Sequence, residues 1–224
     1  MSVLDSVPSQ PRVADAVYER LRAAVIGRHI EPGERLSIPN LAEQLGVSRS
    51  PVREAVQRLV QDGLATEEPR RGAVVATLDL SDVLPLYELR EVLEGFAARL
   101  AAERATAAEI RSLEDVVAAH RGAVDDGDRK RQIELDMLFH KGIREAARNP
   151  ELAGTLERVQ GRITIAMLAS RESWHARALA EHEAILTALR DQSTTEAERL
   201  AIAHIARVRE DLSHQSGDGD GSDA

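Results

Sequence analysis

Apolar residues recur at helical spacing at the start of the chain. Positions 13, 17, 21, 24 and 25 lie on one face of a helix, and this stripe stops before Gly27. A short helix from about Pro39 to Leu45 follows and ends at Gly46, and a cap at Ser48–Pro51 starts a further helix that runs to Asp62. The segments LATEEP and AVVATL predict two short strands around the turn RRG. This order predicts a helix-turn-helix with a small β wing.

The rest of the chain shows helical periodicity without a convincing strand. Its first segment has apolar residues at 86, 89, 93, 96 and 100, in steps of three and four that are typical of one buried helix face. The breaks DDGD, RNP and DQSTT separate helical segments that begin near Leu80, Ala107, Asp128, Glu151, Ser173 and Thr195. An all-helical bundle is the economical interpretation. The predicted fold class is mainly α, with a winged helix-turn-helix followed by this bundle.

These patterns divide the chain into four parts. We expect a flexible N-terminus over residues 1–11, a winged domain over residues 12–77 and a helical domain over residues 78–212. The polar, Gly-rich end SHQSGDGDGSDA, at residues 213–224, is predicted to be disordered. With 43% hydrophobic residues among 224, the chain is long enough to bury two modest cores.

The second helix of the predicted pair has a basic beginning. One face is apolar and consists of Val52, Val56 and Leu59. Arg49 and Arg53 lie in or near its first turn, where a recognition helix places the side chains that enter the major groove. In the wing, Arg70 and Arg71 are placed to reach the DNA backbone or the minor groove. The pattern therefore predicts a DNA reader, and the alternative on pattern alone is a short helix pair that merely faces solvent.

The formal net charge of −9 argues against a nucleic-acid partner, but its distribution changes that conclusion. Residues 1–77 carry 10 Arg and 10 acidic residues, whereas residues 78–224 carry 19 basic and 28 acidic residues. The whole negative excess therefore lies in the helical part, which leaves DNA contact to the neutral, Arg-tipped winged part.

Composition also restricts the location of the protein. There is no cysteine, so disulfides and thiolate metal sites are not available, and the longest apolar run, ITIAMLA, is far too short to span a membrane. The N-terminus lacks a basic start followed by an apolar run, so it does not look like a secretion signal. We expect a cytoplasmic protein with no membrane contact.

The winged part resembles a known family in a specific motif. The stretch LAEQLGVSRSPVREAVQRLVQDGL, followed by RRGAVV, is similar to the winged helix-turn-helix of the GntR family of bacterial transcriptional regulators, over about residues 12–77. The resemblance implies base or phosphate contacts by Ser48, Arg49, Ser50 and Arg53, and close approach of the wing backbone to DNA at Gly72, with Arg71 as a weaker candidate for a contact. Many relatives have a basic residue at the start of the helix before the turn, where this chain reads SIPN with Pro39, so that phosphate contact is not carried over.

Polar side chains lie on the inward stripes of three predicted helices. In IELDMLFHKGI, Asp136 and His140 share a stripe with apolar residues, and His182 and His204 each lie on the apolar stripe of a later segment. A buried carboxylate needs a cation, which Arg144 would supply in a plain salt bridge. A divalent metal would instead satisfy the aspartate and three neutral imidazoles at once. From the residues alone, a metal site and a buried polar network remain equal alternatives.

The helical part also resembles a known domain. DMLFHKGI with RNP, then EHEAIL and AHI, is similar to the FCD ligand-binding domain of FadR-type members of the GntR family, over about residues 80–212. The resemblance implies a metal bound by Asp136, His140, His182 and His204, with zinc as the first candidate and nickel or manganese as alternatives. It also implies a homodimer that senses a small carboxylate.

A cationic side chain near the metal would stabilise an anionic effector bound there, and Arg90 and Arg144 are the candidates. Each has an equally good structural explanation. An i to i+4 pair with Glu94 would account for Arg90, and an exposed place near a helix end would account for Arg144.

The leading hypothesis is a dimeric, ligand-responsive bacterial repressor, not an enzyme, that reads a palindromic operator in double-stranded DNA. The competing class is a metallohydrolase with Glu181 or Glu183 as general base. HEAIL begins like the H-E-x-x-H motif, but residue 186 is Leu, so the second ligand of that motif is absent. A third hypothesis keeps the repressor and makes the metal structural, or replaces it by a polar core.

Overall fold

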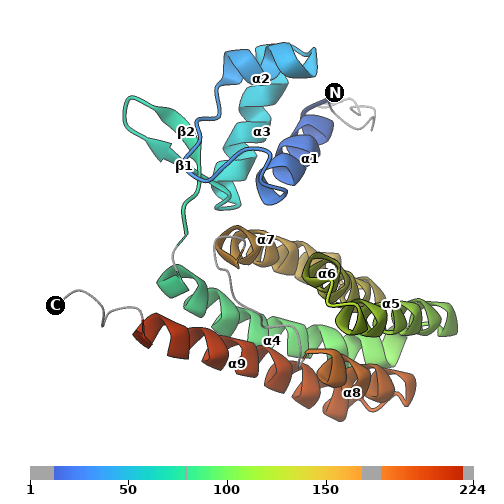
Figure 1. Ribbon diagram of the computed structural model, residues 1–224. Coiled ribbons are helices and arrows are strands. Elements are labelled where there is room, and N and C mark those ends of the chain that lie inside the picture. The colour runs from blue at the N-terminus through green and yellow to red at the C-terminus, as the bar shows by residue number, and fades with distance from the viewer. Residues whose placement is uncertain (1–12, 79, 168–177, 219–224) are drawn as a thin grey trace, which may run out of the picture. The chain divides into compact units, whose positions relative to one another are not determined.

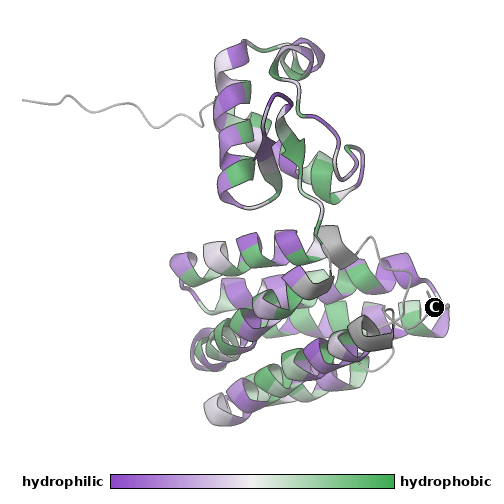
Figure 2. Ribbon diagram, turned by 90° about the vertical axis from the view of Figure 1, so that its left-hand side faces the viewer, coloured by the Kyte–Doolittle hydropathy of each residue, from purple (hydrophilic) through white to green (hydrophobic). Residues whose placement is uncertain are grey.

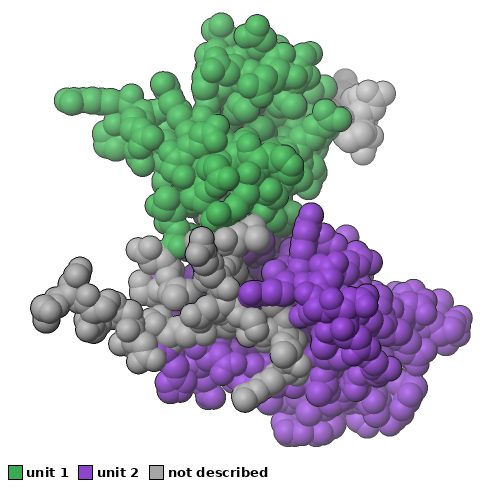
Figure 3. All heavy atoms as spheres, in the orientation of Figure 1, with its two compact units in different colours: residues 1–78 green, residues 79–224 purple. Residues whose placement is uncertain are grey.

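The computed structural model describes residues 13–78, 80–167 and 178–218 (Figure 1). The chain divides into two compact units, residues 1–78 and residues 79–224, which Figure 3 shows in green and purple. Among the helices of the described ranges, none is both long enough and apolar enough to cross a membrane. Each unit is considered by itself below.

The first unit is a winged helix-turn-helix, as predicted. Its elements are α1 (Val13–Ile26), α2 (Ile38–Leu45), α3 (Arg49–Gln61), β1 (Ala65–Glu68) and β2 (Gly72–Val75). Gly46 ends α2 with φ of 65° and donates its amide to the last turn of that helix. The two strands are antiparallel, with Ala65 opposite Val75 and Glu68 opposite Gly72.

Helix α3 is held in place by contacts with α1. Val52, Val56 and Leu59 are buried, which confirms the apolar face predicted for α3. The hydroxyl of Tyr18 donates a hydrogen bond to Asp62, the residue that caps the end of α3. The guanidinium of Arg58 lies 4.0 Å from the centre of the Tyr18 ring and forms an ion pair of 2.7 Å with Asp15. These contacts fix the orientation of α3 within the unit.

The described residues of the second unit are all-helical, as predicted. The elements are α4 (Leu80–Arg104), α5 (Ala107–Asp125), α6 (Arg129–Ala146), α7 (Pro150–Met167), α8 (Ala178–Arg190) and α9 (Thr194–Asp218). The predicted start near Ser173 lies outside the described residues. Thr106 begins α5 with a reciprocal capping box to Glu109, and the Asp128 side chain caps α6. The sequence breaks therefore coincide with helix ends.

Helices α4 and α9 lie side by side (Figure 1), and small residues bring them close together. A Cβ on Gly95 would lie 2.5 Å from Cγ1 of Ile202, so only glycine fits there without a shift. The core of the unit is apolar and consists of residues such as Ala97, Leu113, Phe139, Leu156 and Ile185. Figure 2 shows hydrophobic and hydrophilic residues on the same helices, as expected when each helix buries one face.

Two sequence-based predictions differ from the structure. The apolar stripe predicted for α4 included position 89, but Leu89 is 45% exposed, and Tyr87, Arg90 and Glu94 are buried instead. Burial of Arg90 and Glu94 is possible because their charges compensate one another. The tail predicted to be disordered from residue 213 is helical up to Asp218, since α9 continues beyond the fully buried Leu212. Residues 219–224 lie outside the described ranges.

Candidate metal centre and DNA-reading surface

The four residues predicted as metal ligands come together in the helical unit. Helix α6 supplies Asp136 and His140, α8 supplies His182, and α9 supplies His204. One potential ligand atom from each lies within 4.8 Å of all the others. The three histidines are buried, and the Asp136 side chain is 18% exposed. The helical stripes read from the sequence therefore point into one common centre.

Two of the distances between these ligand atoms are those of neighbouring ligands on one metal ion. Nε2 of His140 lies 3.2 Å from Nε2 of His204, and Nε2 of His182 lies 3.5 Å from Oδ1 of Asp136. Two neighbouring ligands at about 2.0 to 2.2 Å from one ion are separated by roughly 3 to 3.6 Å. Imidazole nitrogens with one carboxylate oxygen form a donor set that suits zinc, nickel or manganese.

The protonation states of these groups also suit a metal. Burial lowers the pKa of His140 and His182, so both imidazoles are neutral near pH 7. Burial raises the pKa of Asp136, but the nearby histidines and Arg90 outweigh that effect and keep the pKa below its usual value. A neutral imidazole and an ionised carboxylate are the forms that bind metal.

The far sides of two histidines explain why a cation is expected between them. Nδ1 of His204 lies 2.7 Å from Oε2 of Glu181, and Nδ1 of His140 lies 3.6 Å from Oε1 of Glu94. A carboxylate beside Nδ1 favours the proton on that nitrogen, which leaves the lone pair on Nε2. The 3.2 Å contact between the two Nε2 atoms is a hydrogen bond when one of them carries a proton; with both protons on Nδ1, two lone pairs face each other there and a shared cation would relieve their repulsion.

His182 is held by rings rather than by hydrogen bonds. Within the part of the chain that the structure describes, its two ring nitrogens have no hydrogen-bond partner. Its ring stacks on Phe139 with centres 4.3 Å apart, and the ring of His120 lies 5.6 Å away. Unpartnered buried nitrogens are rare in proteins, so those of His182 fit a metal ligand better than a satisfied core histidine.

His120 is a residue that sequence reasoning missed, because the sequence pattern did not group it with the inward histidines. It is 1% exposed and lies on the buried face of α5 with Leu113 and Val117. The spacing of 113, 117 and 120 is helical and was the signal for its burial.

Glu94 was also missed, and it links the centre to both candidate effector arginines. Its Oε1 accepts a hydrogen bond of 3.2 Å from Nε of Arg90 and another from Nη2 of Arg144, and it contacts His140. Burial raises the pKa of Glu94, but Arg144, His140 and Arg90 lower it well below its usual value. The i to i+4 pair suggested for Arg90 therefore exists. The exposed position suggested for Arg144 is wrong, because Arg144 is 7% exposed and turned toward Glu94.

The two glutamates considered as general bases are both engaged in other contacts. Glu181 accepts hydrogen bonds from His204 and from Arg207. Burial raises its pKa, but these two hydrogen bonds outweigh burial and lower the pKa to about 2. Glu183 forms an exposed ion pair with Arg121. Both carboxylates are thus already paired with an arginine.

The predicted DNA contacts lie together at the start of α3. Ser48, Arg49, Ser50 and Arg53 are all exposed, and Ser48 precedes the helix without using its hydroxyl as a cap. Across the described ranges, neither arginine forms an ion pair. Backbone amides and free guanidinium groups at a helix N-terminus are suited to phosphates and guanine edges.

The wing arginines differ in their contacts. Arg71 pairs with Glu68 at 2.6 Å and donates a hydrogen bond of 3.2 Å to the Gly33 carbonyl, so it braces the wing. Arg70 is exposed at the tip with φ of 69°, and Gly72 follows with φ of 76°. The positive φ at position 72 is by itself a sufficient reason for glycine there, independent of any approach to DNA.

Two family profiles match the chain. The FCD domain matches residues 85–207, and the profile of bacterial regulatory proteins of the gntR family matches residues 13–75. The Nta operon transcriptional regulator of Aminobacter aminovorans is 34% identical over 186 residues, or 81% of this chain and 86% of that protein. The transcriptional repressor RspR of Escherichia coli is 28% identical over 207 residues, or 92% of this chain and 90% of that protein.

Solved structures show the same fold. Escherichia coli McbR/YncC matches with a TM-score of 0.77 at 24% identity, over 92% of this chain and all (100%) of that one. A transcriptional regulator from a Rhodococcus species matches with a TM-score of 0.73 at 23% identity, over 90% of this chain and 97% of that one. At these identities the two structures support the fold alone.

Proposed function

This chain belongs to the GntR family of bacterial regulatory proteins and carries an FCD domain, and on that basis we propose that it is a metal-containing, ligand-responsive repressor. Family membership makes it a DNA-binding transcriptional regulator. The proposal adds a divalent metal, a small carboxylate effector and a homodimer. RspR, one relative along nearly the whole chain, is named as a repressor, which supports that direction of control.

The observation that carries the proposal is the buried cluster of Asp136, His140, His182 and His204. These residues would hold a divalent metal, with zinc as the first candidate and nickel or manganese as alternatives. With these four protein ligands, an ion that takes five or six ligands would have a coordination position left for a carboxylate. A structural role for the metal is the weaker alternative, because a structural site whose ligands are all protein side chains does not require two buried arginines beside it.

Arg90 and Arg144 are proposed to assist the effector. Both are buried next to the centre, and both share one oxygen of Glu94. An incoming carboxylate would accept hydrogen bonds from these guanidinium groups when it reaches the metal. Effector binding would then change the affinity for DNA through differential binding to two conformations.

A surface of α4 and α9 is proposed to form the homodimer. Leu89 and Val92 on α4 are 45% and 66% exposed, and Ile202 on α9 is 37% exposed over Gly95. Leu89 and Val92 lie on the side of α4 away from Arg90 and Glu94, and with Ile202 of α9, which lies beside Gly95, they are proposed to form one apolar strip. A second copy would cover this strip and would place two winged units on a palindromic operator. Val92→Asp is expected to convert a dimer to a monomer in analytical ultracentrifugation.

DNA reading is proposed for Ser48, Arg49, Ser50 and Arg53, with the wing backbone at Gly72. Arg71 would act mainly by bracing the wing, and its neighbour Arg70 would reach the DNA. Footprinting on the DNA that flanks the protein's own gene tests this part, with Arg49→Ala as the comparison. A protected region that the substitution leaves unchanged, or no protected region at all, would show that these residues do not read an operator there.

Elemental analysis tests the metal. Protein purified without chelator is expected to contain about one equivalent of metal per chain, and the double substitution His140→Ala and His182→Ala is expected to remove it. If both preparations hold equally little metal, the metal centre is wrong. The regulator then remains, with a polar core in place of the metal.

A further inference from the structure

The ligand histidines of the proposed metal centre differ in what faces their second ring nitrogen. Nδ1 of His204 is within hydrogen-bond distance of Glu181, at 2.7 Å. Nδ1 of His140 lies at the longer distance of 3.6 Å from Glu94. His182 is held by ring packing. His204 is therefore the ligand whose orientation depends most directly on one carboxylate.

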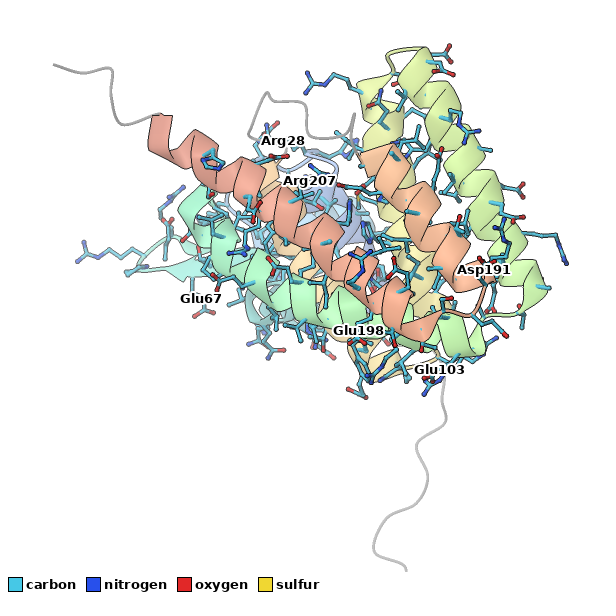
Figure 4. All side chains as sticks on the ribbon, turned by 90° about the horizontal axis from the view of Figure 1, so that it is seen from below. Arg28, Glu67, Glu103, Asp191, Glu198 and Arg207 are labelled. Carbon is cyan, nitrogen blue, oxygen red and sulfur yellow. The ribbon has the colours of Figure 1, made fainter. Side chains whose placement is uncertain are left out.

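Glu181 is itself fixed by a chain of ion pairs along α9. Nη2 of Arg207 donates to Oε2 of Glu181 at 2.7 Å, and Nη1 of Arg207 donates to Oδ2 of Asp211 at 2.7 Å. Arg207, labelled in Figure 4, lies one turn beyond His204 on the same helix. Arg207 thus holds the Glu181 carboxylate in the position from which it contacts His204.

We propose that Glu181 is a positioning residue of the metal centre, which accepts a hydrogen bond from the Nδ1–H of His204 and keeps the Nε2 lone pair of His204 directed at the metal. This inference rests on the proposed metal centre. A carboxylate in this place selects one imidazole tautomer, fixes the ring orientation and makes the imidazole a stronger donor. Without it, His204 is free to place its proton on Nε2, which blocks metal binding by that nitrogen.

The chain contains a matched control on the same helix. Glu183 lies two residues from Glu181, and each forms an ion pair with an arginine, Arg121 in one case and Arg207 in the other. The ion pair of Glu183 joins α8 to α5 rather than to the metal centre. Substitution of either glutamate removes one acidic side chain and one ion pair, so a difference between them reports on His204.

The experiment uses the full chain, stripped of metal by chelator and titrated with Zn²⁺ alone. Glu181→Ala is expected to weaken Zn²⁺ binding by about 10- to 100-fold. Glu183→Ala is expected to stay within about twofold of the original protein, because an exposed ion pair contributes little. Glu181→Gln, whose amide oxygen can still accept a hydrogen bond from Nδ1–H, is expected to give an intermediate affinity and to serve if the alanine variant does not fold.

Two further readouts separate positioning from a general structural role. The helical circular dichroism of the metal-free variants is expected to be unchanged, and the visible absorption bands of the Co²⁺-loaded protein are expected to change in Glu181→Ala but not in Glu183→Ala. Equal Zn²⁺ affinities for these two variants overturn the proposal. A folded original protein that binds no Zn²⁺ would instead overturn the metal centre itself, so the two failures are distinguishable.

Discussion

Glu94 offers the sharpest test of how the buried centre is held together. Glu94→Gln removes one negative charge and keeps the volume of the side chain. Glu94 is 2% exposed, and its Oε1 accepts hydrogen bonds from the guanidinium groups of Arg90 and Arg144, which are 4% and 7% exposed. After the substitution, both guanidinium groups stay buried without an ionised partner at this position.

The expected cost follows from the general behaviour of buried ion pairs. Removal of one partner of a buried pair costs about 3 to 5 kcal/mol, because the remaining charge is desolvated without compensation. The amide oxygen of glutamine still accepts a hydrogen bond, so we expect the lower end, about 3 kcal/mol. For a unit of this size that loss lowers the melting temperature by roughly 10 °C.

Scanning calorimetry of the full, metal-free chain measures this loss. The control is Glu198→Gln, labelled in Figure 4, whose ion pair with Arg99 is 3.7 Å long and joins side chains that are 32% and 43% exposed. Such a pair contributes at most about 1 kcal/mol. Equal shifts for the two substitutions would refute the reasoning. The double variant with Glu94→Gln and Arg144→Met gives a second test. Because it leaves fewer unpaired buried charges, its loss of stability is expected to be smaller than the sum of the two single losses, and an equal sum would also refute the reasoning.

Three further outcomes test other parts of the structure. Arg49→Ala is expected to weaken operator binding by about 10- to 100-fold in a gel-shift titration, whereas Arg99→Ala in the helical unit leaves binding unchanged within about twofold. Tyr18→Phe loses the hydrogen bond to Asp62 and is expected to destabilise the winged unit by about 1 to 2 kcal/mol in calorimetry; an unshifted transition contradicts the contact. Hydrogen bonds from the Thr106 cap lower the pKa of Glu109 below its usual 4.5, so its stabilising effect is present above that pH and is lost as pH falls. Glu109→Gln is therefore expected to lower the melting temperature slightly at pH 7 and by less at pH 3, and an equal change at both values counts against the cap.

The helices of the winged unit were predictable because local signals mark their ends. Gly46 adopts a left-handed conformation that glycine favours, and Ser48 precedes the helix of Arg49 and Arg53. Periodicity alone also placed Asp136 and His140 on the inward face of α6. These features depend on residues close together in sequence, which is the information that periodicity and capping contain.

The contacts of the centre depended on long-range pairing and were not predictable. Glu94 and Arg144 are 50 residues apart, and His204 and Glu181 are 23 apart. On α4 the apolar stripe suggested that Leu89 faces inward, whereas the helix buries the polar pair of Arg90 and Glu94. Only the packing of α4 against α6 and α9 decides that the polar pair lies inside and that Leu89 remains exposed.

The position of the polar centre supports a sensor over a structural role. An apolar core of the same volume is often as stable as a buried ion pair, or more stable, so Arg90, Glu94 and Arg144 are not required for folding alone. If the proposed metal and carboxylate bind there, the unit would gain stability in proportion to their differential affinity for its conformations. In the proposed function, such binding would shift the population of conformations of the helical unit, which is the response that a regulator requires of an effector domain.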